Sequence, residues 1–228
     1  MEQPTNSTGL QQARGHVCQL MKSIYGLRQA REIWGSVINV RFIKWGFQQS
    51  TQDQRLYFYR KGNKFINLIV VVDDMTFGSN DRSLINWFKE MLVESFKVKL
   101  LGELKLLIGW EFDRTENGLY IGQQKYIRRI LDHHNLNHTN YAHTLLPTAT
   151  DLTSTHDGDI KLSTNDHKRY RSLIGGLSYL AICTRPDISF AVSVLSRQLH
   201  APSERHLILA KRVVRYVAGT VDMRIFYP

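Results

Sequence analysis

Residues 68–75 read Leu68-Ile69-Val70-Val71-Val72-Asp73-Asp74-Met75, an unbroken apolar run followed by two adjacent carboxylates. An apolar run of this length is typical of a strand covered on both faces and is too short for a membrane span. Two interpretations remain open here: a polar hairpin turn with both acids in water, or a divalent metal site at a hairpin tip. Two carboxylates with substrate phosphates are a usual ligand set for Mg²⁺, so Asp73 and Asp74 are the candidate ligands.

The composition points to a globular protein with a polyanionic partner. The 228 residues are 43% hydrophobic and 22% charged, and the formal net charge is +10. Such a charge favours nucleic acid ahead of an anionic membrane surface. The two cysteines, Cys18 and Cys183, form no CxxC pair, and no apolar run reaches 18 residues. We therefore expect an intracellular protein, cytoplasmic or nuclear, that is neither secreted nor embedded in a membrane.

The first part of the chain alternates between helical and strand periodicity. We expect an irregular lead-in over 1–16 and a fold of the α+β class around an antiparallel sheet. The expected elements are a strand at 17–22, a helix at 30–45, a hairpin of 56–59 with 65–72, a strand to Gly78, a helix from Asp81 to Ser95, strands at 96–101 and 104–113, and a basic helix at 123–136.

The second part of the chain has a different composition. Residues 137–165 are rich in Thr, Ser, Asn, His and Asp, which predicts a linker and a domain boundary. Beyond it the apolar period is helical, with helix starts at Pro186 and Pro202-Ser203 and a short final strand at 225–227. The predicted organisation is therefore a sheet-containing domain at 17–136, the linker, and a helical region at 166–228.

Basic residues recur on two of the expected helices. Exposed helical cations are usually a solvated surface, but several such faces in a +10 chain favour contacts with nucleic-acid phosphates. The candidates are Lys125, Arg128, Arg129, Arg205, Lys211, Arg212 and Arg215.

Histidines also cluster, at His133, His134, His138 and His143. A zinc site needs three or four converging ligands, and no cysteine pair or carboxylate is spaced to complete one here. The sequence therefore does not predict a zinc site.

Several blocks of the sequence, in order, resemble the reverse transcriptase region of copia-type retrotransposon polyproteins. They are VCQLMKSIYGLRQA at 17–30, VVDDM at 71–75, LGELK at 101–105, QKYI at 124–127, YRSLIG at 170–175 and TRPDI at 184–188. The resemblance implies an RNA-directed DNA polymerase with a partial palm at 17–136 and a helical thumb or connection-like region at 166–228. It also implies a two-metal Mg²⁺ site with Asp73 and Asp74 as catalytic ligands.

The resemblance further implies the partners, a primer–template of RNA and DNA and deoxynucleoside triphosphates. It adds Arg28 and Gln29 to the nucleic-acid-binding candidates. The chain departs from the family pattern in two places: Val71 stands where a Tyr is usual, and Arg31-Glu32 stands where Pro-Arg is usual.

The family's first catalytic aspartate lies upstream of the block that Met1-Glu2-Gln3-Pro4 resembles. We therefore expect a reverse transcriptase fragment that is inactive alone, without the bridging carboxylate and the fingers. The alternative is a non-catalytic basic remnant of a retroelement that binds nucleic acid.

Overall fold

The computed structural model describes residues 21, 23–24, 26–147 and 159–228. It divides into two compact units, one ending at Leu101 and one running from Gly102 to Pro228. The lead-in expected at 1–16 and nearly all of the strand expected at 17–22 lie outside the described residues. No helix in the described part of the chain has the length and apolar character needed to cross a membrane.

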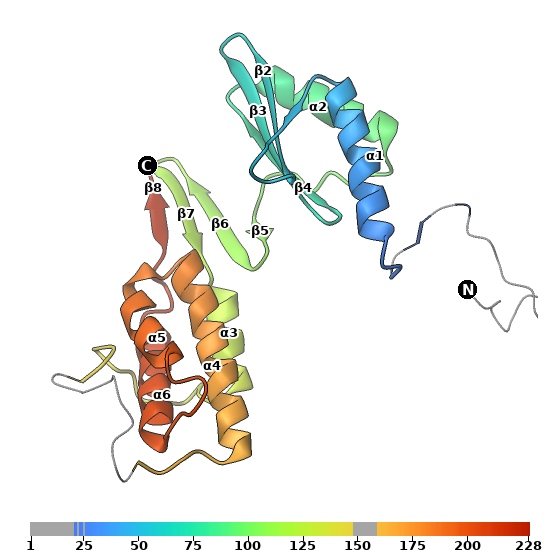
Figure 1. Cartoon of the computed structure of the whole chain (residues 1–228). Helices are drawn as coiled ribbons and strands as arrows, with labels where there is room; N and C mark the ends of the chain where they lie inside the picture. The colour runs from blue at the N-terminus through green and yellow to red at the C-terminus, as the bar shows by residue number, and fades with distance from the viewer. Residues whose placement is uncertain (1–20, 22, 25, 148–158) are drawn as a thin grey trace, which may run out of the picture. The chain divides into compact units, whose positions relative to one another are not determined.

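The first unit is a four-stranded antiparallel sheet with two helices (Figure 1). The strands lie in the order β1-β2-β3-β4, each next to its neighbour in sequence. The elements are α1 (Ala30–Lys44), β1 (Gln48–Gln49), β2 (Leu56–Lys61), β3 (Lys64–Val71), β4 (Asp74–Ser79) and α2 (Arg82–Ser95). The helices expected at 30–45 and after Asp81 and the hairpin around Gly62 are thereby confirmed.

One face of this sheet packs against both helices. Ile66, Leu68 and Val70 alternate along β3 and are buried, whereas Asn67 and Ile69 between them are exposed. The expectation that β3 is covered on both faces is therefore wrong for the described residues. Both helices cover the same face of the sheet, because Ile38 and Phe42 of α1 and Phe88 of α2 belong to one buried cluster with the inward-facing side chains of β3. The other face of β3 is left without a covering helix in the described residues.

Aromatic rings and one helix cap hold this unit together. The fully buried Phe42 ring lies 5.1 Å from Tyr57 and 5.9 Å from Phe88, both edge to face, a geometry that stabilises beyond area burial alone. Asp81 caps α2 by accepting from the backbone N–H of Leu84 at 3.0 Å. Its hydrogen bond with Lys64 is the main reason that the pKa of Asp81 lies below its usual range.

The segment after α2 differs from the prediction. Residues 96–101 form no strand, because Phe96 and Val98 pack against the first unit's core without a neighbouring strand to pair with. The strand expected at 104–113 is split by a turn at Ile108-Gly109, where both φ angles are positive, into β5 (Leu106–Leu107) and β6 (Trp110–Thr115).

The second unit combines a second antiparallel sheet with helices. Its strands lie in the order β5-β6-β7-β8, so the C-terminal strand expected at 225–227 is confirmed. The remaining elements are β7 (Gly118–Gly122), α3 (Gln124–His133), α4 (Thr164–Cys183), the 3₁₀ turn η1 (Pro186–Ile188), α5 (Ser189–Ser196), α6 (Glu204–Gly219) and β8 (Ile225–Tyr227).

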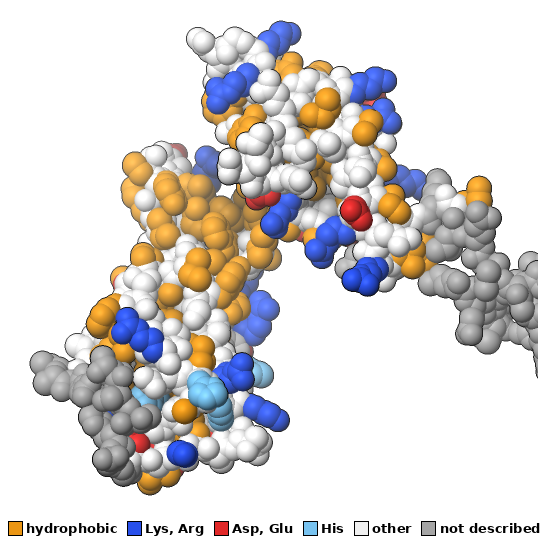
Figure 2. Space-filling view, viewed as in Figure 1, with side chains coloured by type: hydrophobic (Ala, Val, Ile, Leu, Met, Phe, Trp, Pro, Cys, Tyr) orange, Lys and Arg blue, Asp and Glu red, His pale blue; other side chains and the backbone are white. Residues whose placement is uncertain are grey.

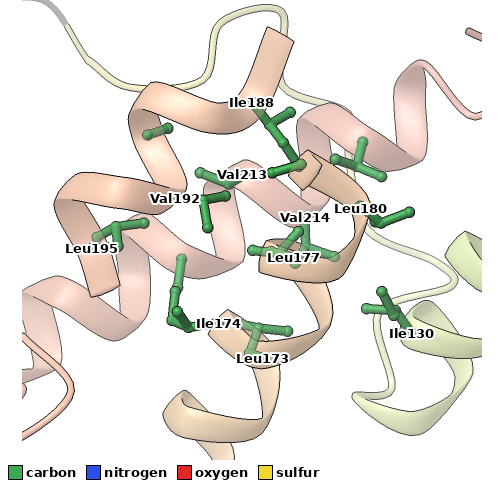
Figure 3. Packing of buried hydrophobic residues seen from close by; sticks show 14 of the residues in the cluster. Ile130, Leu173, Ile174, Leu177, Leu180, Ile188, Val192, Leu195, Val213 and Val214 are labelled. Atoms are coloured by element: carbon green, nitrogen blue, oxygen red, sulfur yellow. The ribbon is translucent and has the colours of Figure 1, made fainter. Parts of the chain in front are cut away.

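The division at residue 101 differs from the domain boundary expected within 137–165. Buried side chains of α3, such as Ile130, belong to the same cluster as Leu177 of α4, Val192 of α5 and Val214 of α6 (Figure 3). Because α3 buries its apolar face against the later helices, it folds with them.

A buried arginine ties the end of α6 to the turn after α4. The Arg185 side chain is 1% exposed and forms a two-pronged pair with Asp187, at 2.9 Å from Nε and 2.8 Å from Nη2. Its Nη1 and Nη2 also donate to the carbonyl and hydroxyl oxygens of Thr220, at 3.0 and 2.7 Å. The guanidinium lies over the Tyr216 ring, 5.8 Å from its centre. A buried charge needs such partners.

Candidate functional site

Asp73 and Asp74 lie at the tip of the β3–β4 hairpin. Val71 pairs with Asp74, which leaves Val72 and Asp73 as a two-residue turn. Val72 has φ 56°, a left-handed conformation that is strained for a β-branched residue. Two-residue hairpin turns with a positive φ at the first central residue alone usually have Gly at that position. The placement of both acids at a hairpin tip is as predicted, and both are exposed.

A tryptophan of α1 holds this turn in place. The Trp34 indole donates from Nε1 to the Val72 carbonyl oxygen at 3.0 Å. The same ring meets Phe96 edge to face, 5.7 Å between centres. Helical spacing places Trp34 on the inner face of α1, but it gives no signal for a bond to a residue 38 positions away. The hydrogen bond of Trp34 to the turn is therefore a contact that sequence reasoning missed.

The chemistry of the two carboxylates fits part of a Mg²⁺ site. Neither side chain has a hydrogen bond or ion pair with another described residue, so all four oxygens remain open to a ligand. Hard oxygen donors beside solvent suit an ion that keeps several waters. Over the described ranges no set of three or more acidic, His or Cys side chains converges to hold a metal. Among the described residues, the hairpin tip thus offers two carboxylates as possible ligands.

Arg28 and Gln29 precede α1 and are exposed. Gln29 is the residue that begins the helix, but its side chain makes no capping hydrogen bond. Both side chains are accessible to a ligand at the N-terminal end of the helix that carries Trp34.

The α3 cations lie on an exposed helix face. Lys125, Arg128 and Arg129 are all exposed, while the neighbouring Ile127 and Ile130 are buried. Arg129 extends over the Tyr126 ring at 5.9 Å. Accessible cations on one face of an amphipathic helix are suited to contact phosphates.

The α6 cations have different surroundings. Arg212 Nη2 donates to the Thr144 hydroxyl at 2.7 Å, and Arg215 Nε donates to the Asn140 carbonyl at 2.6 Å. Both side chains fasten the 140–144 segment onto α6, and they are only partly exposed, as are Lys211 and Arg205. The structure thus gives Arg212 and Arg215 a structural role that helical spacing does not predict.

Comparison with known proteins places these features in a family. Residues 1–149 match the family described as reverse transcriptase (RNA-dependent DNA polymerase). The chain is 36% identical over 217 residues to the "Retrovirus-related Pol polyprotein from transposon RE1" of Arabidopsis thaliana, covering 92% of this chain and 14% of that protein. It is 35% identical to the corresponding polyprotein from transposon TNT 1-94 of Nicotiana tabacum, over 90% of this chain and 16% of that protein.

A shorter relative is "Putative transposon Ty5-1 protein YCL074W" of Saccharomyces cerevisiae, 31% identical over 93% of this chain and 68% of that protein. No solved structure matches the chain. This chain spans only a small part of the plant polyproteins, so their whole activity does not transfer directly. The family match covers well over half of the sequence and agrees with the similarity to the plant polyproteins. The chain therefore belongs to the reverse transcriptase family, in the form found in copia-type retrotransposon polyproteins.

Proposed function

We propose that the first unit is part of the palm of an RNA-directed DNA polymerase, with the helices of the second unit as a thumb or connection-like region. The observation that supports this most directly is the hairpin tip, where Asp73 and Asp74 are exposed, unpaired and held by Trp34. In this proposal the two carboxylates bind Mg²⁺. When bound, Mg²⁺ supplies charge stabilisation for the attacking oxygen and the phosphates.

The roles of the protein residues follow from their positions. Asp73 and Asp74 hold the metal, and Trp34 fixes the turn so that both carboxylates keep one geometry. Positioning matters here, because a misplacement of about 1 Å can reduce the rate on the order of 10²-fold. Arg28 and Gln29, at the start of the same helix as Trp34, contact the template or the nucleotide.

The sheet topology leaves a place for a further ligand. β3 pairs with both β2 and β4, whereas β4 has one partner among the described strands, so its outer edge beside Asp74 is open. A further strand on that edge would bring a third carboxylate next to the hairpin tip. The family resemblance assigns such a carboxylate to a strand upstream of Met1. We therefore propose that polymerisation requires that strand.

Primer extension with Mg²⁺ or Mn²⁺ tests this proposal. We expect no extension by the 228-residue chain, and template-dependent extension by a version lengthened upstream to include the strand and its aspartate. Asp73→Asn should abolish the activity of the longer form, whereas Asp222→Asn, an exposed acid of the second unit, should leave it unchanged. Extension by the short chain that is abolished by Asp73→Asn would refute the need for a third carboxylate.

The second candidate is a non-catalytic retroelement remnant that binds nucleic acid. The exposed cations of α3 favour it, because they need no metal site to bind phosphates. A longer form that folds and binds duplex but does not extend a primer would support this candidate.

Binding to a primer–template duplex separates the two sets of cations. Replacing Lys125, Arg128 and Arg129 by Gln should weaken binding for all sequences alike. The slope of the logarithm of the binding constant against the logarithm of the salt concentration should decrease in size by roughly one unit for each phosphate that the protein no longer neutralises. Replacing Arg212 and Arg215 by Gln should instead reduce stability, because those side chains hold the 140–144 segment. Equal reductions of affinity and slope in the two variants would contradict this assignment.

A further inference from the structure

An open pocket lies between the end of α3 and the first half of α4. Its volume is about 410 Å³, and six residues line it: His133, His134, Asn135, Lys168, Arg169 and Ser172. Every one of these side chains carries a hydrogen-bond donor, and none is a carboxylate. Such a lining suits an anion with several oxygen acceptors. Lys and Arg side chains also gather along one edge of this helical region (Figure 2).

The helices that form the pocket are packed against the core of the second unit. Ile130 and Leu131 of α3 and Leu173 of α4 lie close in sequence to lining residues and are buried in the core. Figure 3 shows Ile130 and Leu173 among the side chains of that core. Gly176 lets the two helices approach closely, since a Cβ there would lie 3.2 Å from Ile130 Cδ1. Sites built on packed helices hold their geometry better than sites on loops. The core therefore fixes the helices from which the lining side chains extend.

Arg169 is fixed at the pocket by the end of α3. Its Nη2 donates to the His134 carbonyl oxygen at 2.6 Å, one of the last carbonyls of the helix, which have no helical partner. That bond also reduces the negative charge that the carbonyl would present to an anion. A guanidinium has five N–H donors, so others remain for a ligand.

The pocket lining carries two cationic side chains, Lys168 and Arg169, and no carboxylate. The Lys168 and His133 side chains have no hydrogen bond or ion pair with the described part of the chain. Burial, and then electrostatic interactions with His133 and Arg169, lower the pKa of His134 to about 4. The nearest acids in sequence lie outside the pocket lining: Asp132 accepts from Asn137 at 2.6 Å, and Asp166 accepts from Ser163 at 2.8 Å.

We propose that this pocket binds a phosphate group, with Lys168 and Arg169 supplying the charge and Ser172 and His133 further hydrogen bonds. Arg and Lys are the usual phosphate partners in proteins. The phosphate can come from a free phosphate ester or from a nucleic-acid backbone. Only the second source rests on the proposed function.

Titration of the full chain with inorganic phosphate, followed by amide NMR, tests the pocket. We expect saturable shifts concentrated at residues 133–135 and 168–172. Lys168→Gln and Ser172→Ala, each at an exposed side chain, should each raise Kd, and Lys168→Gln by about tenfold or more, as expected for loss of a charge-assisted hydrogen bond. Lys161→Gln makes the same charge change at an exposed lysine outside the pocket lining and should leave Kd unchanged.

A duplex without terminal phosphates then identifies the source. Displacement of bound inorganic phosphate assigns the pocket to the nucleic-acid backbone, and no displacement assigns it to a free phosphate ester. Shifts spread over all basic helix faces, or a Kd equal in Lys168→Gln and Lys161→Gln, would overturn the proposal. Primer extension does not enter this readout, so failure of the polymerase proposal would leave the result intact.

Discussion

Replacing Arg185 by Met should destabilise the second unit by about 3 kcal/mol. The substitution keeps much of the apolar stem but removes four hydrogen bonds, two to Asp187 and two to Thr220. Breaking a buried ion pair costs about 3–5 kcal/mol when the remaining charge stays buried. The Asp187 side chain is 27% exposed and can regain water, which favours the lower end of that range.

Native-state hydrogen exchange measures this effect without assuming that the two units unfold together. Amides of α4 and α6 should lose about 3 kcal/mol of protection, whereas those of α2, in the other unit, should not change. Arg171→Met, an exposed arginine of α4, should change protection by less than about 0.5 kcal/mol. A loss below about 1 kcal/mol in Arg185→Met, or an equal loss in α2, would refute the reasoning.

The same pair predicts a pH dependence. Burial raises the pKa of Asp187, but the hydrogen bonds and positive charge of Arg185 outweigh it and hold the pKa below its ordinary value of 3.8. The resulting stabilisation is complete above pH 3.8 and is lost as pH falls through the lower folded-state value. As pH falls over that range, the unfolding free energy of Arg185→Met should decrease less than that of the wild type.

Three further predictions follow from single positions. Val72→Asn should raise the unfolding free energy measured in urea by about 1 kcal/mol, because Asn tolerates the φ of 56° at the hairpin turn. A lower urea midpoint for the variant would contradict the backbone strain at Val72. Gly118→Ala should cost about 2 kcal/mol by forcing its Cβ within 2.2 Å of the Tyr227 carbonyl oxygen, whereas Gly175→Ala, with open space around it, should be neutral or stabilising. The His134 pKa of about 4 lies below the unfolded value of 6.5, so acid titration from pH 6.5 to 4 should lower the unfolding free energy by up to about 3 kcal/mol. In His134→Gln the unfolding free energy should depend less on pH over the same range.

Local signals predicted most of the helices and the hairpin tip. The Asp81 cap, the positive φ of Gly46 after α1 and the alternation along β3 each depend on residues close in sequence. The strand predicted at 96–101 is wrong because Phe96 and Val98 alternate as strand residues do, whereas a strand also needs a neighbour to pair with, which periodicity does not show.

Long-range contacts account for what the sequence did not predict at the candidate site. The bond from Trp34 to Val72 joins residues far apart in the chain, and it exists only once α1 packs against the sheet. The strain at Val72 is equally hidden, since Val is an ordinary strand residue until the register places it in the turn. The packing of α3 with the later helices is hidden for the same reason, because the apolar face of α3 does not show in the sequence which helices will cover it.

The cations of α3 and α6 show why net charge alone is a weak guide to a nucleic-acid surface. Arg128 and Arg212 are the same residue type on amphipathic helices, and both count equally toward the +10 charge. Counterion release depends on cations that can approach phosphates, whereas Arg212 already donates to Thr144 at 2.7 Å and has its Nε buried. The two arginines differ only in the folded protein, where Arg212 has a hydrogen-bond partner from a distant part of the chain and Arg128 is exposed. The salt dependence of binding should therefore follow the exposed α3 face rather than the total number of basic residues.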